Sequence, residues 1–330
     1  MSGEFDLIDK IRESLGDQPT SLVDLGIGDD CAIIRQPPDQ LRWLVTTDML
    51  MQGRHFDLTN DPEQLKSIGQ KAIAVNISDI AAMAGTPVAA FVSVALPMES
   101  AVNSARFLTE GMRLESEKFQ ISLAGGDTNF WSGPLVINVT LTGYEPEGGA
   151  VLRSGAKVGD LICVSGPLGG SLPSGRHLRP EPRIRFAQEL KRRLGPCLHA
   201  MIDISDGLAG DLRHILAESG GLGAQLVASQ IPVHQDVLLC HPETADNLEQ
   251  QLGHAMGDGE DFELCFCIDP DSSENDLPEG SRIIGNIIEN KSLQMIWPDG
   301  KVKPWTGSGF DHGRSPLHKI PSSGSGWKCN

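Results

Sequence analysis

Several features that define other protein classes are missing from this chain of 330 residues. No apolar run of eighteen or more residues occurs, so we expect no segment to span a membrane. The seven cysteines include no CxxC pair, which argues against a zinc site and a disulfide framework. The first residues carry acids where a secretory signal would be basic and then apolar. The sequence therefore predicts a cytoplasmic protein without a membrane partner, whose cysteines are mostly small buried side chains.

Positive charge is also scarce. The chain has 27 lysines and arginines against 44 aspartates and glutamates, a formal net charge of −17. Such a balance argues against nucleic acid as a partner, and it would repel a phosphorylated substrate unless cations intervened. The P-loop pattern GxxxxGK[ST] does not occur, so any nucleotide must be bound in another way.

The length predicts two domains, which we place at residues 1–150 and 151–318, followed by a tail at 319–330 that we expect to be disordered. Residues 145–160 have the composition of a linker. Periodicity and Gly/Pro punctuation predict helices at 3–16, 62–84, 100–119, 183–194 and 207–220. Strands are predicted at 31–36, 41–48, 88–97, 120–124, 135–144, 161–167, 200–205 and 262–268. The fold class is therefore α/β (α+β).

Two adjacent aspartates, Asp29 and Asp30, stand in the stretch LGIGDDCAII between a glycine turn and a predicted strand. Two like charges at close range repel by about 4 kcal/mol at an effective dielectric near 20. A turn tolerates one aspartate but does not need two. Single aspartates are ordinary caps and turn residues, and we interpret Asp160 as a turn residue and Asp211 as an exposed helix residue. The remaining aspartates at predicted element ends are Asp48, Asp79, Asp127, Asp203 and Asp206.

Asp79 lies on an apolar stripe of the helix predicted at 62–84, and Lys71, two turns away, is expected to point elsewhere. A buried carboxylate without a partner is costly and requires a cation or a metal ion. Asp48 follows Thr46 and Thr47 at the end of a predicted strand. Carboxylate and hydroxyl oxygens are hard ligands that suit Mg²⁺, which is commonly held jointly by carboxylates and substrate phosphates. The acids therefore predict divalent ions that recruit a nucleotide.

Ten segments in a fixed order, spread over residues 3–313, carry a family resemblance. They are GEFDLI, LGIGDDCA, TTDML with GRHF, KAIAVNISDIAAMAGTP, LAGGDT, RSGAKVGD, HLRPEPR, DISDGLAGDL, GEDFELCF and GFDH. Together they resemble the thiamine-monophosphate kinases. The resemblance implies a two-domain aminoimidazole-ribonucleotide-synthetase-like fold, with an N-terminal domain that forms a homodimer and a C-terminal domain that closes over the nucleotide. It also implies transfer of the γ-phosphoryl group of ATP to thiamine monophosphate, giving thiamine diphosphate, with several Mg²⁺ ions.

The resemblance also implies roles for individual residues, by motif position. The implied metal ligands are Asp30, Thr46, Thr47, Asp48, Asp79, Asp127, Asp203 and Asp206. The implied ATP contacts are Gly126, Asp127, Arg153 and Ser205, and the implied contacts to thiamine monophosphate are His55, Glu260 and Phe310. Phe310 stands where the family commonly has Tyr, so stacking is kept while a hydroxyl hydrogen bond is lost. Trp305 is expected to pack rather than to bind substrate, and the loop at 166–180 looks shorter than its family counterpart.

The implied chemistry needs no covalent nucleophile. The acceptor is an oxygen of a phosphate monoester, already nucleophilic at neutral pH, so catalysis reduces to alignment and charge screening. Two alternatives stay open: another ATP-using enzyme of the same superfamily, and a non-catalytic protein that binds Mg²⁺ and nucleotide. Selenophosphate synthetase needs a reactive cysteine near its N-terminus, and residues 1–20 contain none. The hydrogenase-maturation dehydratase uses a terminal cysteine, whereas Cys329 is penultimate here. Turnover of ATP with thiamine monophosphate separates enzyme from binder.

Overall fold

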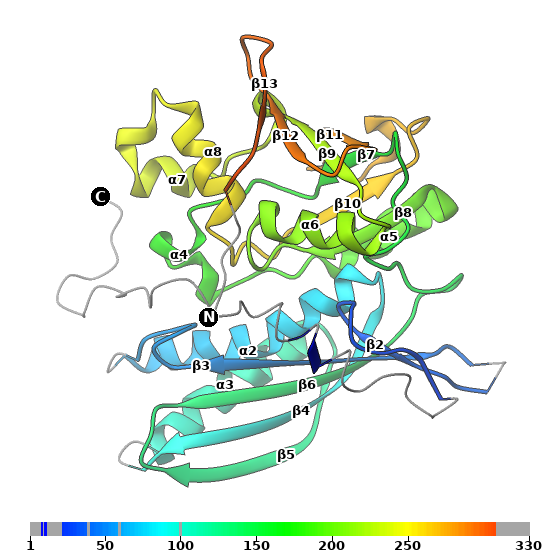
Figure 1. The fold of residues 1–330 in the computed structure, drawn as a ribbon. Coiled ribbons are helices and arrows are strands. Elements are labelled where there is room, and N and C mark those ends of the chain that lie inside the picture. The colour runs from blue at the N-terminus through cyan, green and yellow to red at the C-terminus, as the bar shows by residue number, and fades with distance from the viewer. Residues whose placement is uncertain are drawn as a thin grey trace.

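The computed structural model describes Ile8, Lys10, Ile11 and residues 22–37, 40–58, 61–98 and 101–307. Most of the helix predicted at 3–16, the implied substrate contact Phe310 and the tail at 319–330 lie outside the described residues. Within the described residues, the structure contains two sheets with helices packed against them (Figure 1).

The first sheet is built from the first half of the chain and has the strand order β1-β2-β3-β6-β4-β5. All neighbouring strands are antiparallel except β4 and β5, which are parallel. The strands are β1 Val23–Leu25, β2 Ala32–Ile34, β3 Trp43–Met51, β4 Thr86–Pro97, β5 Ser122–Trp131 and β6 Val136–Tyr144.

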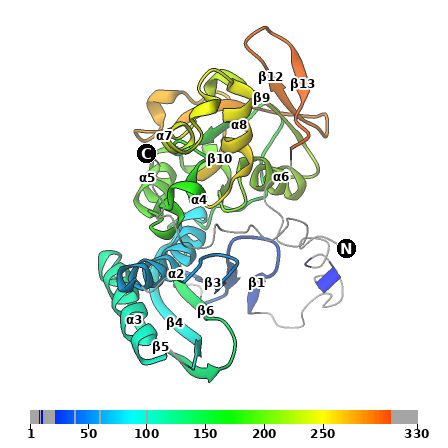
Figure 2. The same cartoon turned by 90° about the vertical axis from the view of Figure 1, so that its left-hand side faces the viewer.

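Two helices, α2 (Pro62–Ala82) and α3 (Ala101–Lys118), lie on one face of this sheet (Figure 2). The side chain of Asp61 caps α2 by accepting a hydrogen bond from the Glu63 amide, and Pro62 occupies the first helical position. The two helices approach closely because Gly69 and Gly111 lie at their crossing. A Cβ atom on Gly111 would lie 2.0 Å from the carbonyl oxygen of Lys66.

The second sheet is built from the second half and has the order β13-β12-β9-β11-β7-β10-β8. Its strands are β7 Leu161–Val164, β8 Leu198–Asp203, β9 Gly223–Val227, β10 Leu264–Ile268, β11 Arg282–Ile288, β12 Leu293–Ile296 and β13 Val302–Pro304. Its α-helices are α4 Ser171–Ser174, α5 Ile184–Leu194, α6 Leu208–Glu218, α7 Gln235–Cys240 and α8 Leu248–Gly257. The 3₁₀ helices are η1 Arg176–Leu178, η2 Gly195–Cys197, η3 Ala228–Gln230, η4 Pro242–Thr244 and η5 Glu274–Asp276.

Helix α2 joins the two halves. It contacts α3, β3 and β6 of the first half and α5, β8 and η1 of the second. Its residues Ile77 and Ile80 belong to the same buried cluster as Met201 and Phe266 of the second sheet. The all-round apolar character predicted for this helix is thereby confirmed and explained, because it is covered on both sides. The predicted domain boundary at residue 150 stays a prediction, although the first sheet ends at Tyr144 and the second begins at Leu161.

Comparison with the sequence predictions shows where local signals failed. The helices predicted from residue 62 onward are confirmed to within two residues at each end. The predicted ends of two strands were wrong: β3 continues past Asp48 to Met51, and β5 continues through the Gly-Asp motif to Trp131. Pairing of β5 with β4 overrides the turn tendency of Gly125 and Gly126.

Two further expectations were wrong. Asp211, predicted to be exposed, is 3% exposed, and one of its oxygens accepts a hydrogen bond from the Asp206 amide at 3.1 Å. Cys240 is disulfide-bonded, which the absence of a CxxC pair did not predict. The other described cysteines are free, and all but Cys197 are buried, as expected. Among the described residues, no helix has the length and apolar character needed to cross a bilayer.

Candidate active site

Four of the implied metal ligands meet where α2 crosses between the two sheets. Asp30 comes from the turn before β2, Asp79 from the last turns of α2, and Asp203 from the end of β8. One carboxylate oxygen of each lies within 4.8 Å of the others. Asp48 of β3 hydrogen-bonds to Asp79. We call Asp30, Asp48, Asp79 and Asp203 the acidic cluster.

Hydroxyl groups support this cluster from two sides. The Thr46 hydroxyl donates a hydrogen bond to Asp79, and the Ser78 hydroxyl donates one to Asp203 at 2.7 Å. Thr46 and Asp48 reach the cluster together because alternate residues of a strand share one face, here the face that α2 covers. These short hydroxyls orient the carboxylates without adding positive charge.

The carboxylates of the cluster are strongly perturbed. Burial and the charge of Asp30 raise the pKa of Asp203 to about 8, and burial with the charges of Glu260 and Asp30 raises that of Asp48 to about 6. Burial and the charges of Asp48 and Asp203 raise the pKa of Asp79 well above its ordinary value. Each shift means that the ionised form is destabilised in the protein alone and would be stabilised by a nearby cation.

The two adjacent aspartates of the sequence have different partners, both supplied by Arg153. The Arg153 guanidinium donates a hydrogen bond to Asp30 at 2.7 Å, and its main-chain amide donates one to Asp29 at 3.1 Å. Burial and the charge of Asp30 raise the pKa of Asp29 to about 7. Asp29 therefore fixes the segment after residue 150, while Asp30 belongs to the acidic cluster.

The acidic cluster has the donor chemistry that a hard divalent cation requires. It offers carboxylate oxygens with supporting hydroxyls and no sulfur or imidazole ligand. Oδ2 of Asp30 is buried, and no hydrogen-bond partner for it exists within the described part of the chain. A buried carboxylate oxygen in that position is costly unless a cation binds it. The residues present therefore fit Mg²⁺.

The structure does not bring every implied ligand to the cluster. The side chain of Thr47 lies on the open face of the first sheet, where it hydrogen-bonds with the Val139 carbonyl and the Thr140 hydroxyl. Asp127 lies on the edge strand β5 and is exposed, with a hydrogen bond from Asn129. Across the sheet, Asp127 aligns through Ser93 and Asn138 with Met49, which also faces away from α2.

Gly126 and Ser205, two implied ATP contacts, have main-chain roles that the sequence did not indicate. A Cβ atom on Gly126 would lie 1.7 Å from the Val92 carbonyl oxygen, so the close pairing of β4 and β5 requires glycine there. The carbonyl oxygen of Ser205 accepts a hydrogen bond from the Glu260 amide at 2.7 Å. Ser205 and Asp206 come two and three positions after Asp203, so the implied ATP contact is close in sequence to the acidic cluster.

The implied contacts to the acceptor adjoin the same junction. The Glu260 carboxylate lies 2.6 Å from the ammonium group of Lys71, which also donates a hydrogen bond to the His55 carbonyl at 3.2 Å. Nδ1 of His55 accepts a hydrogen bond from the Met51 amide at 3.0 Å. Lys71 therefore brings His55 and Glu260 together. Sequence reasoning missed this role, because the only available signal was a lysine in a mainly apolar helix.

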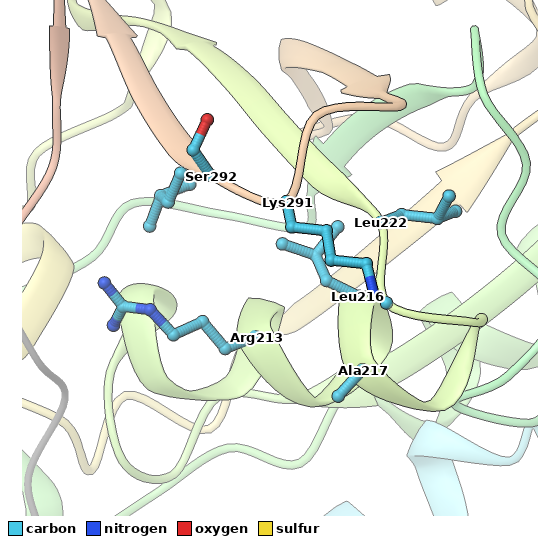
Figure 3. A pocket seen from close by; sticks show the side chains of 8 residues that line it. Arg213, Leu216, Ala217, Leu222, Lys291 and Ser292 are labelled. Atoms are coloured by element: carbon cyan, nitrogen blue, oxygen red, sulfur yellow. The ribbon is translucent and has the colours of Figure 1, made fainter.

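A cavity of about 210 Å³ lies away from the acidic cluster, between α6 and the start of β12 (Figure 3). Its walls include Arg213, Leu216, Leu222 and Lys291, and none of the implied site residues. Arg213 donates hydrogen bonds to the carbonyl groups of Ala209 and Gly307 at 3.0 and 2.9 Å, so its charge is used to hold main chain. The acidic cluster, and not this cavity, is therefore the candidate active site.

Comparison with known proteins shows the family to which the chain belongs. The family described as AIR synthase related protein, N-terminal domain, matches residues 28–144. The thiamine-monophosphate kinase of Rhodopirellula baltica is 38% identical over 305 residues, which cover 89% of this chain and 93% of the relative. That of Haemophilus influenzae is 34% identical over 341 residues, covering 94% and 98%. This chain belongs to the thiamine-monophosphate kinase family.

A solved structure of a family member extends the match to three dimensions. AaThiL complexed with AMPPCP and TMP is 28% identical to this chain and superposes with a TM-score of 0.78, covering 94% of this chain and 97% of that chain. The α/β aminoimidazole-ribonucleotide-synthetase-like fold implied by the family resemblance is thereby confirmed. Trp305, predicted to pack, does pack against a buried apolar cluster of the second half, which includes Leu226 and Met295.

Proposed function

We propose that this member of the thiamine-monophosphate kinase family transfers the γ-phosphoryl group of ATP to the phosphate of thiamine monophosphate, giving thiamine diphosphate and ADP. The observation that carries the proposal is the acidic cluster beside Glu260. The charge of Glu260 raises the pKa of Asp48, so the implied metal end and the implied acceptor end of the site are within electrostatic reach of each other. The structure of AaThiL with AMPPCP and TMP supports the same pair of ligands.

We propose that Asp30, Asp48, Asp79 and Asp203, with Thr46, hold Mg²⁺. The bound ions would screen the repulsion between the two phosphate-bearing substrates. Arg153, held by Asp30 at 2.7 Å, supplies a fixed positive charge at the same place. Its charge is secure, because a guanidinium does not lose its proton in proteins.

The chain's own residues bind and align the reactants rather than activate a nucleophile. A phosphate monoester oxygen attacks without help from a general base. The proposed task of Ser205 and Arg153 is to position the nucleotide, and that of His55 and Glu260 is to position the acceptor. Helix α2 contacts both halves of the chain, so one rigid element can set the distance between the two reacting ends.

We further propose that the chain forms a homodimer through the open face of the first sheet. Four large apolar side chains of this face are exposed: Met49 at 52%, Met51 at 41%, Phe91 at 44% and Trp131 at 42%. An apolar sheet face left in water commonly marks an interface. Thr47 and Asp127 lie on the same face. Their implied roles as metal ligands stay proposals, and in the proposed homodimer both residues would lie on the face that the second copy covers. Light scattering tests the assembly, with twice the 35.4 kDa chain mass expected.

Mass detection of the product tests the proposed function. Purified protein, ATP and Mg²⁺ with thiamine monophosphate should yield thiamine diphosphate, and free thiamine in its place should yield no product. Phosphorylation of free thiamine, or no product from either acceptor, would overturn the proposal. The cytoplasmic location stays a prediction from the sequence.

A further inference from the structure

Lys71 is the most deeply buried charged side chain on α2. Its relative exposure is 0%, and its neighbours along the helix are Ile68, Ala72 and Ile73. Lysine is almost never fully buried unless it is paired. Its ammonium group lies 2.6 Å from Glu260, which comes from the second half of the chain, and it donates to the carbonyl of His55 at 3.2 Å. The pair therefore connects the two halves at the acceptor end of the site.

Glu260 is held in an unusual conformation. Its φ of +58° lies in the left-handed region, which residues other than glycine rarely adopt. Its amide donates to the Ser205 carbonyl at 2.7 Å, and its carbonyl accepts from the Ser171 hydroxyl at 2.7 Å. Strained backbone that is fixed from both sides clusters at ligand sites. The main chain thus aims this carboxylate instead of leaving it free to move.

The two oxygens of Glu260 are in different environments. Oε2 is buried beside Lys71, while the side chain as a whole keeps 19% exposure. The solvent-exposed surface of the Glu260 side chain therefore belongs to atoms other than Oε2. Burial would raise the pKa of Glu260, but the charges of Lys71 and His177 outweigh it and lower the pKa. Burial and the charge of Lys71 lower the pKa of His177 to about 4, so at neutral pH Lys71 is the cation that keeps Glu260 ionised.

Lys71 and Asp79 are carried by the same helix. Asp79 comes eight positions after Lys71, which is about 12 Å along a helix that rises 1.5 Å per residue. Asp79 belongs to the acidic cluster, and Lys71 fixes Glu260. A single rigid element therefore sets the distance between the metal end and the acceptor end.

We propose that Lys71 is a positioning residue for the acceptor: it anchors one oxygen of Glu260 across the boundary between the halves, so that the other oxygen is presented to the cationic, amine-bearing part of thiamine monophosphate. The inference rests on the proposed function. A solely structural role is a poor explanation, because a buried ion pair is often no more stabilising than a well-packed apolar pair. The strained backbone of Glu260 adds a cost that packing alone does not require.

Steady-state kinetics of Lys71→Met test the inference. We expect the KM for thiamine monophosphate to rise about tenfold or more, because the variant loses the proposed hydrogen bond from the substrate to the charged Glu260, and hydrogen bonds to charged groups are strong. The KM for ATP should stay within about twofold. Burial without a cation raises the pKa of Glu260, so the ratio of the variant's KM to the wild-type KM at the same pH should fall as the pH increases from 6.5 to 9. Lys66→Met is the matched control. Lys66 lies on the same helix but pairs with Glu63 and Glu110, so its KM values should be unchanged.

A second variant covers the case in which Lys71→Met does not fold. Lys71→Met combined with Glu260→Gln removes both charges of the buried pair, so its melting temperature should approach that of the wild type while its KM for thiamine monophosphate stays high. Wild-type turnover with an unchanged KM in Lys71→Met, or a wild-type KM in the double variant, would overturn the inference alone. Absence of turnover by the wild type would overturn the proposed function, and the inference with it.

Discussion

At the scale of the residue, position in the sequence does not decide what an aspartate does. Asp29 and Asp30 are adjacent, yet Asp29 accepts a hydrogen bond from the main-chain amide of Arg153, whereas Asp30 accepts one from its guanidinium and belongs to the acidic cluster. Thr46 and Thr47 are adjacent as well, yet their side chains lie on opposite faces of β3. Period-two alternation is readable from sequence and separates Thr47 from Thr46 and Asp48. The contact between Lys71 and Glu260 is not readable, because it joins segments far apart in the chain.

A substitution in the acidic cluster should separate activity from stability. Asp48→Asn removes a charge that burial and neighbouring acids disfavour, so the metal-free protein should gain on the order of 1–3 kcal/mol at pH 8. The same variant should lose phosphoryl transfer at every Mg²⁺ concentration, because a metal ligand is gone. Thermal unfolding in EDTA and product formation measure the two effects.

Asp160→Asn is the control for this substitution. Asp160 is also buried, but it accepts hydrogen bonds from the Lys157 amide and His199, both at 2.8 Å, and it lies in a turn as predicted. Its loss should destabilise the protein by about 1–2 kcal/mol. Equal destabilisation by both variants would show that the cluster carboxylates are ordinary structural acids.

At the scale of the element, α2 was predicted to within two residues, the extent of β5 was predicted wrongly, and the strands β9, β11, β12 and β13 were not predicted. The cap at Asp61, the proline at its start and the apolar periodicity all indicate the same helix. The glycines before Asp127 indicate a turn, but they lie inside a strand because β4 pairs with that segment over its whole length. Local signals favour a helix, whereas strand length depends on a partner that the local sequence does not specify.

The crossing of α2 and α3 gives a prediction at this scale. Gly111→Ala should destabilise the fold by about 1–3 kcal/mol, because its Cβ atom would meet the Lys66 carbonyl at 2.0 Å. Gly253→Ala in α8 is the matched control. Nothing lies within 4 Å of its Cβ position, so the higher helix propensity of alanine should leave stability unchanged or raise it by about 0.5–1 kcal/mol. Urea unfolding measures both, and equal stability of the two variants would refute the proposed packing.

At the scale of the whole molecule, charge and metal binding are coupled. The chain carries a net charge of −17, and three of its buried or half-buried acids, Asp30, Asp79 and Asp203, converge at the junction between the halves. Composition predicted a need for cations, and the motifs predicted which acids provide the site. Neither predicted the strand order of the second sheet, in which β9 lies between β11 and β12, because that order depends on long-range pairing.

The stability of the metal-free protein should therefore depend on pH. Asp48 and Asp203 have raised pKa values of about 6 and about 8 in the folded chain, so between about pH 4 and pH 8 the folded state holds more protons than the unfolded state. Stability in EDTA should accordingly fall as the pH rises through this window. Saturating Mg²⁺ should raise the melting temperature most at the upper end. A melting temperature in EDTA that rises with pH over the same range would contradict this assignment.

The most direct test of the account is to locate the metal. Crystals of the full chain grown with Mn²⁺ in place of Mg²⁺, together with AMPPCP, report the metal position through anomalous scattering. The account predicts an anomalous peak bounded by the carboxylates of Asp30, Asp79 and Asp203. Bound nucleotide with no peak at these three residues would contradict it.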